Sequence, residues 1–216
     1  MREQQPGFVV VEGPIGVGKT SLAERLAARF GTELLLEGPD ENPFLERFYQ
    51  DPRAAALPTQ LFFLFQRAQQ IQALRQADIF QPVRVADFLL DKDRLFAQLT
   101  LDADEFKLYE QVWDKMSLDA PEPDLVVYLQ APVDTLMARV ARRGIHYEQG
   151  IERAYIEKLS DAYMRFFYDW NRSPLLIVNT ADINPIDDDR DFELLFAEIC
   201  NVKSGRHFFN PGRLAG

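Results

Sequence analysis

The feature that most constrains this chain is a glycine-rich turn between a short apolar run and an amphipathic stretch. Residues 8–12 read FVVVE, residues 13–21 read GPIGVGKTS, and LAERLAARF follows. The turn matches the pattern G-x-x-x-x-G-K-[ST], in which backbone N–H groups at a helix N-terminus converge on phosphate oxygens. A turn that needs glycine only for its shape is the alternative, but the Lys-Thr pair and both flanking elements favour a phosphate site.

The turn predicts a bound nucleoside triphosphate, with ATP as the expected phosphate donor. Lys19 would neutralise the β- and γ-phosphates, and the hydroxyl of Thr20 would bind Mg²⁺. The pattern does not identify the molecule that accepts the phosphate. We expect the triphosphate to lie against the whole turn, which consists of Gly13, Pro14, Ile15, Gly16, Val17, Gly18, Lys19, Thr20 and Ser21.

Further apolar runs along the chain predict the fold. Continuous runs of Val, Leu and Ile are typical of buried parallel strands, and helical patterns lie between them. The alternation predicts an α/β fold with a doubly wound, five-stranded parallel sheet, and we expect residues 1–216 to form a single domain. An acidic stretch at residues 182–191 is expected to be a loop. The expected strands are residues 8–12, 32–37, 83–87, 125–129 and 175–179. The expected helices are residues 20–30, 58–77, 93–116, 134–143 and 151–172.

The composition narrows the partners and the compartment. The chain has 216 residues, of which 47% are hydrophobic and 27% charged, and its formal net charge is −10. This charge repels nucleic-acid polymers and anionic membranes, while local cations can still collect around a small anion. We find no apolar run of about 18 residues and no signal-peptide pattern. The only cysteine is Cys200, which excludes an internal disulfide. We therefore expect a cytoplasmic protein that acts on a small molecule.

Two acidic residues end apolar runs at the predicted carboxyl edge of the sheet. Glu37 ends the second run, and Asp87 ends the third. Ligands of doubly wound sheets bind at this edge, and a kinase that acts on a hydroxyl needs a carboxylate near the acceptor oxygen. Either residue could take the hydroxyl proton. A solvated acid that caps a turn is the alternative, and two such acids beside a phosphate turn favour catalysis.

One face of the predicted helix 58–77 has the size of a nucleoside base. Gln60 and Arg67 lie on nearly the same face, roughly 10 Å apart along the axis, with Phe63 between them. An amide, an aromatic ring and a cation could together hold a heterocyclic base. A core helix is the alternative, because residues 61–65 are apolar all round. The residues of this helix alone leave both interpretations open.

A stripe of arginines predicts a lid. Arg139, Arg142 and Arg143 share a helix face, and Gly144 then ends the helix. A lid at about residues 139–150 would place these charges over the transferring phosphoryl group and exclude water. A solvated basic face that pairs with nearby acids fits the same residues.

The chain resembles the deoxynucleoside kinase family, in particular its bacterial deoxyadenosine/deoxyguanosine kinases. The resemblance implies a P-loop kinase fold and the transfer of the ATP γ-phosphate to the 5′-hydroxyl of a deoxynucleoside, for nucleotide salvage. It implies deoxyadenosine as the first substrate to expect, then deoxyguanosine or deoxycytidine, and a homodimer. It extends from Phe8 to Asn179 and is carried by EGPIGVGKTSLAERL, ENPFLERFYQD, TQLFFLFQR, ADFLLDKDRLFA and RRGIHYEQGI.

The resemblance also implies roles on the sugar and phosphate side. Glu37 corresponds to a strand-end glutamate near the 5′-hydroxyl. Asp87 corresponds to the acid of an Asp/Glu-Arg-Ser motif, the expected base and magnesium-side carboxylate. Tyr49 and Glu148 correspond to the pair that holds the sugar 3′-hydroxyl. Asp182 falls where the loop over the ATP adenine is expected.

On the base side, the resemblance implies that Gln60 reads the base and that Arg67 and Asp93 contact its edge. This Arg–Asp pair is found in the purine and deoxycytidine kinases of the family. Arg139 and Arg143 correspond to lid arginines that hold the developing charge.

Two positions depart from the family pattern. Phe88 stands where the motif has an arginine, and Ile145 stands where many relatives have a third lid arginine. Both changes remove positive charge near the phosphates, although Arg142 can compensate from the lid. We expect them to affect rate and donor preference more than reaction type.

Three other classes of protein share parts of this pattern. A nucleotide kinase of the thymidylate kinase type would share the phosphate turn and lid, but it would need a cation beside the acceptor's own phosphate. A non-catalytic kinase-fold subunit would not need Lys19, Thr20, Asp87 and Arg143. A P-loop GTPase is disfavoured because the chain has no N-K-x-D element.

Overall fold

Residues 6–76, 84–116 and 120–211 are described by the computed structural model of this chain. The strands are β1 (Phe8–Glu12), β2 (Leu34–Leu35), β3 (Arg84–Ala86), β4 (Leu125–Gln130), β5 (Leu175–Asn179) and β6 (Arg206–Phe209). The helices are α1 (Lys19–Phe30), α2 (Leu45–Gln50), α3 (Pro52–Gln76), α4 (Leu90–Thr100), α5 (Ala103–Met116), α6 (Val133–Arg143), α7 (Arg153–Tyr168) and α8 (Asp189–Asn201), with 3₁₀ turns η1 (Pro39–Glu41) and η2 (His146–Gly150).

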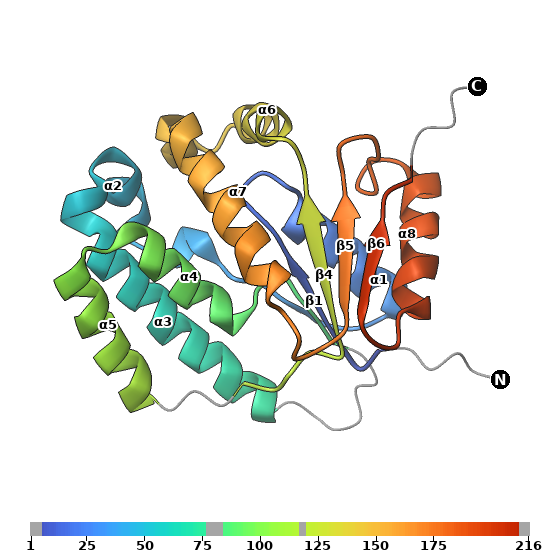
Figure 1. Ribbon diagram of the computed structural model, residues 1–216, viewed down its shortest axis with the longest axis horizontal. Coiled ribbons are helices and arrows are strands. Elements are labelled where there is room, and N and C mark those ends of the chain that lie inside the picture. The colour runs from blue at the N-terminus through green and yellow to red at the C-terminus, as the bar shows by residue number, and fades with distance from the viewer. Residues whose placement is uncertain (1–5, 77–83, 117–119, 212–216) are drawn as a thin grey trace.

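The strands form one parallel sheet in the order β2-β3-β1-β4-β5-β6. β2 and β3 lie on one side of β1, and β4, β5 and β6 lie on the other side. The order in which strands are added to the sheet therefore changes direction at β1. Val10 of β1 pairs with Ala86 on one side and Val126 on the other. The carboxyl ends of the strands meet at one edge, beside α6 (Figure 1). A ligand site is expected at this edge, next to the point of reversal.

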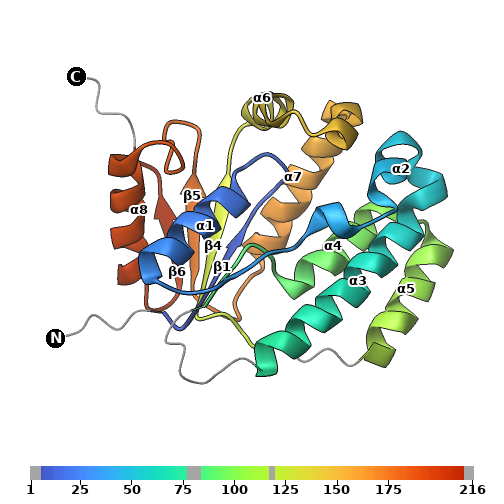
Figure 2. The same ribbon diagram turned by 180° about the vertical axis from the view of Figure 1, so that it is seen from behind.

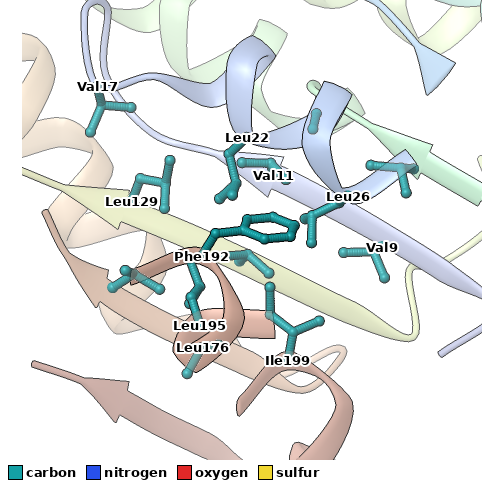
Figure 3. Packing of buried hydrophobic residues seen from close by; sticks show 14 of the residues in the cluster. Val9, Val11, Val17, Leu22, Leu26, Leu129, Leu176, Phe192, Leu195 and Ile199 are labelled. Carbon is teal, nitrogen blue, oxygen red and sulfur yellow. The ribbon is translucent and has the colours of Figure 1, made fainter. Parts of the chain in front are cut away.

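Two helical layers cover the sheet because successive strand side chains point to opposite faces. Val9 and Val11 of β1 lie in the core cluster that packs against α1 and α8 (Figures 2 and 3). Val10 lies in the second cluster, with Tyr163 and Phe167 of α7. Helices α3, α4 and α5 extend this second layer away from the sheet (Figure 1). None of the helices in the described residues is long and apolar enough to span a membrane.

The predicted α/β class and doubly wound topology are confirmed, but the sheet has six strands rather than five. The additional strand, β6, pairs with β5 at the edge of the sheet. Its burial alternates, and Phe208 is 71% exposed. The segment RHFF therefore lacks the continuous apolar run by which the other strands were predicted. The expected strand at residues 32–37 is also shorter, since β2 contains only Leu34 and Leu35, and residue 83 lies outside the described residues.

Three predicted helices differ from the structure by more than one residue at a boundary. The helix expected at residues 151–172 corresponds to α7, which spans only Arg153–Tyr168. The helix expected from Pro58 begins at Pro52, and Ala55 and Ala56 pack against Leu45 of α2, which favours the longer helix despite the internal proline. The end expected at residue 77 lies outside the described residues.

The helix expected at residues 93–116 is divided into α4 and α5. Leu101 is extended, and the carboxylate of Asp102 accepts hydrogen bonds from the backbone N–H groups of Asp104 and Glu105 at 3.0 and 2.9 Å. This N-terminal cap starts a new helix within the apolar pattern. The acidic stretch 182–191 is a loop only as far as Asp188, whose side chain caps α8 in the same way.

Candidate active site

A cavity of about 600 Å³ opens at the carboxyl edge of the sheet. Its wall comes from the glycine-rich turn, α3, α4, the lid helix α6 and the loop between β5 and α8. Gly13, Pro14 and Arg67 were expected at the site but do not line this cavity. The expected residues that line it are Ile15, Gly16, Val17, Gly18, Lys19, Thr20, Ser21, Glu37, Tyr49, Gln60, Phe63, Asp87, Asp93, Arg139, Arg143, Glu148 and Asp182.

The glycine-rich turn needs glycine for both backbone conformation and space. Gly18, the residue before α1, has a φ of 101°, and a Cβ there would lie 2.5 Å from Cδ1 of Ile186. A Cβ on Gly13 would lie 2.5 Å from the carbonyl oxygen of Leu129. The Lys19 ammonium donates to the carbonyl oxygen of Gly13 at 2.9 Å. Burial, followed by repulsion from Lys92, lowers the pKa of Lys19. The turn thus has the tight backbone and the cation that a triphosphate requires.

Asp87 connects the glycine-rich turn to Glu37, the other predicted acid. The Thr20 hydroxyl donates to Oδ2 of Asp87 at 2.6 Å, and the backbone N–H of Glu37 donates to Oδ1 at 2.8 Å. Hydroxyl and carboxylate oxygens are the ligands that Mg²⁺ prefers, and Mg²⁺ is usually held by one or two protein groups together with substrate phosphates. The side chains of Thr20 and Asp87 therefore fit the predicted magnesium site.

The Glu37 carboxylate is held by two buried cations. Its Oε1 lies 2.9 Å from a guanidinium nitrogen of Arg67 and 2.7 Å from Nζ of Lys92. Burial opposes the ionisation of Glu37, but Lys92, Arg67 and Lys19 together outweigh it and lower its pKa to about 2. Glu37 is therefore an ionised hydrogen-bond acceptor across the physiological pH range rather than a strong base.

This low pKa predicts a pH-dependent contribution to stability. Because the pKa of Glu37 falls from its ordinary 4.5 to about 2 on folding, its charge stabilises the native state above pH 4.5 and loses this effect in more acidic solution. We expect the difference in unfolding free energy between wild type and Glu37→Gln to shrink as the pH falls from about 5.5 toward 3. Denaturant titrations would measure it, with the exposed Glu193→Gln as control. A difference that stays constant over this range contradicts the prediction.

Arg67 lies behind the cavity wall instead of at the base edge in this structure. Its side chain is 0% exposed and forms an ion pair with Asp93 at 3.3 Å. It also donates to the Gln70 side chain at 2.7 Å, and its guanidinium lies 4.2 Å from the centre of the Phe88 ring. Phe88 is thus a platform for Arg67 and is absent from the cavity lining. Burial opposes the charge, but Asp93 and Glu37 raise the pKa of Arg67, which stays a cation.

The remaining base-side residues reach the cavity. Gln60 is 3% exposed and lines the cavity with Phe63 and Asp93. The Gln60 amide has no hydrogen bond to another residue in the described part of the chain, so both of its groups are available to a ligand. Gln60 and Phe63 therefore face the cavity while Arg67 supports this wall from behind, and binding of a base by this face stays a prediction.

The three arginines of the predicted lid have different environments. Arg139 donates to the carbonyl oxygen of Val17 at 3.2 Å and to the Thr180 hydroxyl at 3.0 Å, which fixes it beside the turn. Arg143 donates to Glu148 through Nε at 3.0 Å. Arg142 is exposed and lines the cavity, which makes it available for an incoming anion.

The expected sugar-side pair shares one part of the wall. Tyr49 stacks on Tyr147, with ring centres 6.1 Å apart, and burial raises the pKa of Tyr49 well above its ordinary value. Its phenol is therefore a hydrogen-bond donor at any physiological pH. Glu148 is buried and pairs with Arg143, so the lid is connected to the side of the cavity where Tyr49 lies.

Two charged residues of the site were not predicted. Glu12 ends β1 and is 0% exposed; it accepts hydrogen bonds from the backbone N–H of Leu89 at 2.7 Å and from the Tyr163 hydroxyl at 3.0 Å. Burial raises the pKa of Glu12. An acid at the end of an apolar run was the signal used for Glu37, and it would have found Glu12. Lys92 has no comparable signal.

The parallel sheet, the glycine-rich turn after β1, the acid after β3 and the arginine helix over the turn define a P-loop kinase. Comparison with known proteins then gives the family. The model of the deoxynucleoside kinase family matches residues 9–203, and the chain belongs to this family, whose members phosphorylate deoxynucleosides.

Individual relatives agree with this assignment. The chain is 34% identical to deoxyguanosine kinase of Bacillus subtilis (strain 168) over 200 residues, which cover 89% of this chain and 95% of that protein. It is 31% identical to deoxyadenosine kinase of Lactobacillus acidophilus over 186 residues, 79% of this chain and 84% of that protein. A structure of deoxyadenosine kinase from M. mycoides with dCMP and a flexible dCDP bound shares the fold, with a TM-score of 0.77 at 22% identity over 89% of this chain and 98% of that one.

Proposed function

We propose that the chain transfers the γ-phosphate of ATP to the 5′-hydroxyl of a deoxynucleoside, giving ADP and a deoxynucleoside 5′-monophosphate for nucleotide salvage. The observation that carries this proposal is the contact of Thr20, at the phosphate turn, with Asp87, which in turn holds Glu37. It connects the expected donor site to an acidic acceptor site in one cavity.

Asp87 and Glu37 have different roles in the proposed reaction. Asp87 contacts the hydroxyl of Thr20 in the phosphate turn and the backbone N–H of Glu37. Asp87 and Thr20 together would hold Mg²⁺. When bound, this ion neutralises charge on the β- and γ-phosphates. Glu37 lies on the acceptor side, where its carboxylate accepts the 5′-hydroxyl hydrogen bond and aligns the oxygen with phosphorus. The hydroxyl proton would pass along this hydrogen bond to Glu37 as the new O–P bond forms and ADP leaves, while Asp87 acts on the phosphate side together with Thr20. A loose transition state needs this alignment more than it needs a strong base.

Several cations around the γ-phosphate would hold the negative charge that develops on it during transfer. Lys19 belongs to the turn, and Arg139, Arg142 and Arg143 come from the proposed lid helix, with Arg139 fixed beside the turn. Such charges act most strongly where water is excluded. Arg142 supplies a lid charge that Ile145 lacks. Asp182 lines the cavity from the loop between β5 and α8, and the adenine of ATP would bind against this loop.

Sugar and base contacts favour a deoxynucleoside with an amino group on its base. Tyr49 and Glu148 would hold the 3′-hydroxyl, and the stacked Tyr49 leaves little room for a 2′-hydroxyl. At the base, Gln60 offers an amide and Asp93 offers a carboxylate acceptor. The 6-amino group of adenine can donate to this carboxylate, so deoxyadenosine is our first candidate, followed by deoxyguanosine and deoxycytidine.

A thymidylate-kinase-like activity fits the acceptor side less well. Glu37, Asp87 and Asp93 line this side of the cavity, and an acceptor that already carries a phosphate would be repelled by them. Purified protein should therefore phosphorylate deoxyadenosine, deoxyguanosine or deoxycytidine in the presence of ATP and Mg²⁺, and leave dTMP unchanged. Coupled assay of ADP release and chromatography of the products would measure this. Activity on dTMP alone, or ATP binding without transfer, contradicts the proposed function.

We also propose that the protein is a cytoplasmic homodimer with one folded domain per chain. The negative net charge and single cysteine support the compartment. Phe65 of α3 and Leu108 of α5 are 53% and 47% exposed, on two helices at the outside of the molecule (Figure 1), and support the dimer. Light scattering should give twice the chain mass of 24.9 kDa.

A further inference from the structure

Lys92 has an unusual place for a lysine. It lies in the first turn of α4 and is only 5% exposed. The N-terminus of a helix disfavours positive charge, and burial of an ammonium group is costly unless it is paired. A residue in this position therefore requires a strong compensating interaction. Its Nζ supplies two, at 2.7 Å from Glu37 and 3.9 Å from the fully buried Glu12.

The two cations around Glu37 act on the same oxygen. Lys92 from α4 and Arg67 from α3 both lie closest to Oε1. Oε2 makes no hydrogen bond with another residue in the described ranges, and Glu37 lines the cavity. The carboxylate is therefore anchored through one oxygen while the other is left for a ligand.

Position 88 provides no cation that could anchor Glu37, because it is a phenylalanine. Its ring lies under the Arg67 guanidinium and does not reach the cavity. Position 88 thus supplies no charge to the acceptor site. Lys92 does line the cavity, and it is the nearest cation to Glu37 in the described part of the chain.

We propose that Lys92 is a positioning residue for phosphoryl transfer: it fixes Oε1 of Glu37, together with Arg67, so that Oε2 is presented to the acceptor hydroxyl. The inference rests on the proposed function, since it assigns Glu37 to the acceptor side. In this role Lys92 acts through Glu37, so we expect ATP binding not to depend on it.

The test compares Lys92→Met, which removes the charge, with Lys92→Gln, which keeps a donor, and Lys92→Arg, which keeps the cation. The matched control is Lys158→Met, on the exposed face of α7. Turnover is measured with deoxyadenosine and ATP and is expressed per mole of protein that binds a fluorescent ATP analogue. This normalisation separates a loss of positioning from a loss of folded protein.

We expect kcat of Lys92→Met to fall about 100-fold, because small misplacement of a catalytic group has effects of this size. The KM for ATP should not change, Lys92→Gln should be intermediate, and Lys92→Arg should recover most of kcat. Normal kcat in Lys92→Met overturns the proposal, as does a raised KM for ATP with unchanged kcat. Loss of ATP binding in both neutral variants also overturns it. An inactive wild-type protein would refute the proposed function instead.

Discussion

Asp87→Asn is expected to lower kcat for deoxynucleoside phosphorylation by about 10²–10³-fold, the range for loss of one group that stabilises charge in the transition state. The substitution keeps the size of the side chain, and an asparagine oxygen can still accept from the backbone N–H of Glu37. What it removes is the negative charge beside Thr20. Nucleoside binding should survive, because Asp87 is not among the residues proposed to hold the base or the 3′-hydroxyl.

Steady-state kinetics and calorimetric titration with deoxyadenosine would measure the two effects separately. Asp161→Asn, an exposed change on α7, is the matched control and should leave both unchanged. Near-normal turnover of Asp87→Asn would remove Asp87 from the reaction. Turnover and nucleoside affinity that fall together would point to a structural role.

Arg67→Met is expected to have the largest effect on stability. Arg67 is fully buried and pairs with Glu37 and Asp93, and loss of one partner of a buried ion pair typically costs about 3–5 kcal/mol. For a chain of this size, that corresponds to a decrease in Tm of about 6–20 °C. Arg67→Lys should restore only part of it, because an ammonium cannot keep the fork of contacts or stack on Phe88 in the same way.

Differential scanning calorimetry would measure these changes. Arg94→Met is the matched control, because the pair of Arg94 with Glu110 is half-exposed and such pairs contribute about 0–1 kcal/mol. Equal melting temperatures for Arg67→Met and Arg94→Met would show that the buried cluster does not stabilise the fold. If the loss of stability in Arg67→Met becomes smaller in acid, where the unpaired carboxylates of Glu37 and Asp93 take up protons, the stabilisation by Arg67 is electrostatic.

The fold was largely predictable because local patterns and topology agree in this chain. Each buried strand has a continuous apolar run, and the turn at residues 13–20 specifies a strand before it and a helix after it. The failures have local causes. β6 is an edge strand with alternating burial, and the capping carboxylate of Asp102 divides an apolar pattern that otherwise continues.

The site was predictable where a residue's role depends on its place along the chain. Lys19, Thr20 and Asp87 follow from the turn and a strand end. The roles of Arg67 and Lys92 depend on how α3 and α4 pack against each other and against Glu37, and sequence spacing does not contain that information. The family resemblance implied Arg67 at the base edge, whereas three acceptors and an aromatic ring hold it behind the wall.

The contact between Thr20 and Asp87 has a consequence for the folding of newly synthesised chains. The two residues are 67 positions apart and meet only after β3 has aligned with β1. Non-local parallel pairing of this kind forms slowly. We therefore expect half-made chains to lack the Thr20–Asp87 side of the nucleotide site and to bind ATP more weakly than finished chains. Cellular nucleotide should accordingly protect finished copies from proteolysis while leaving incomplete ones exposed.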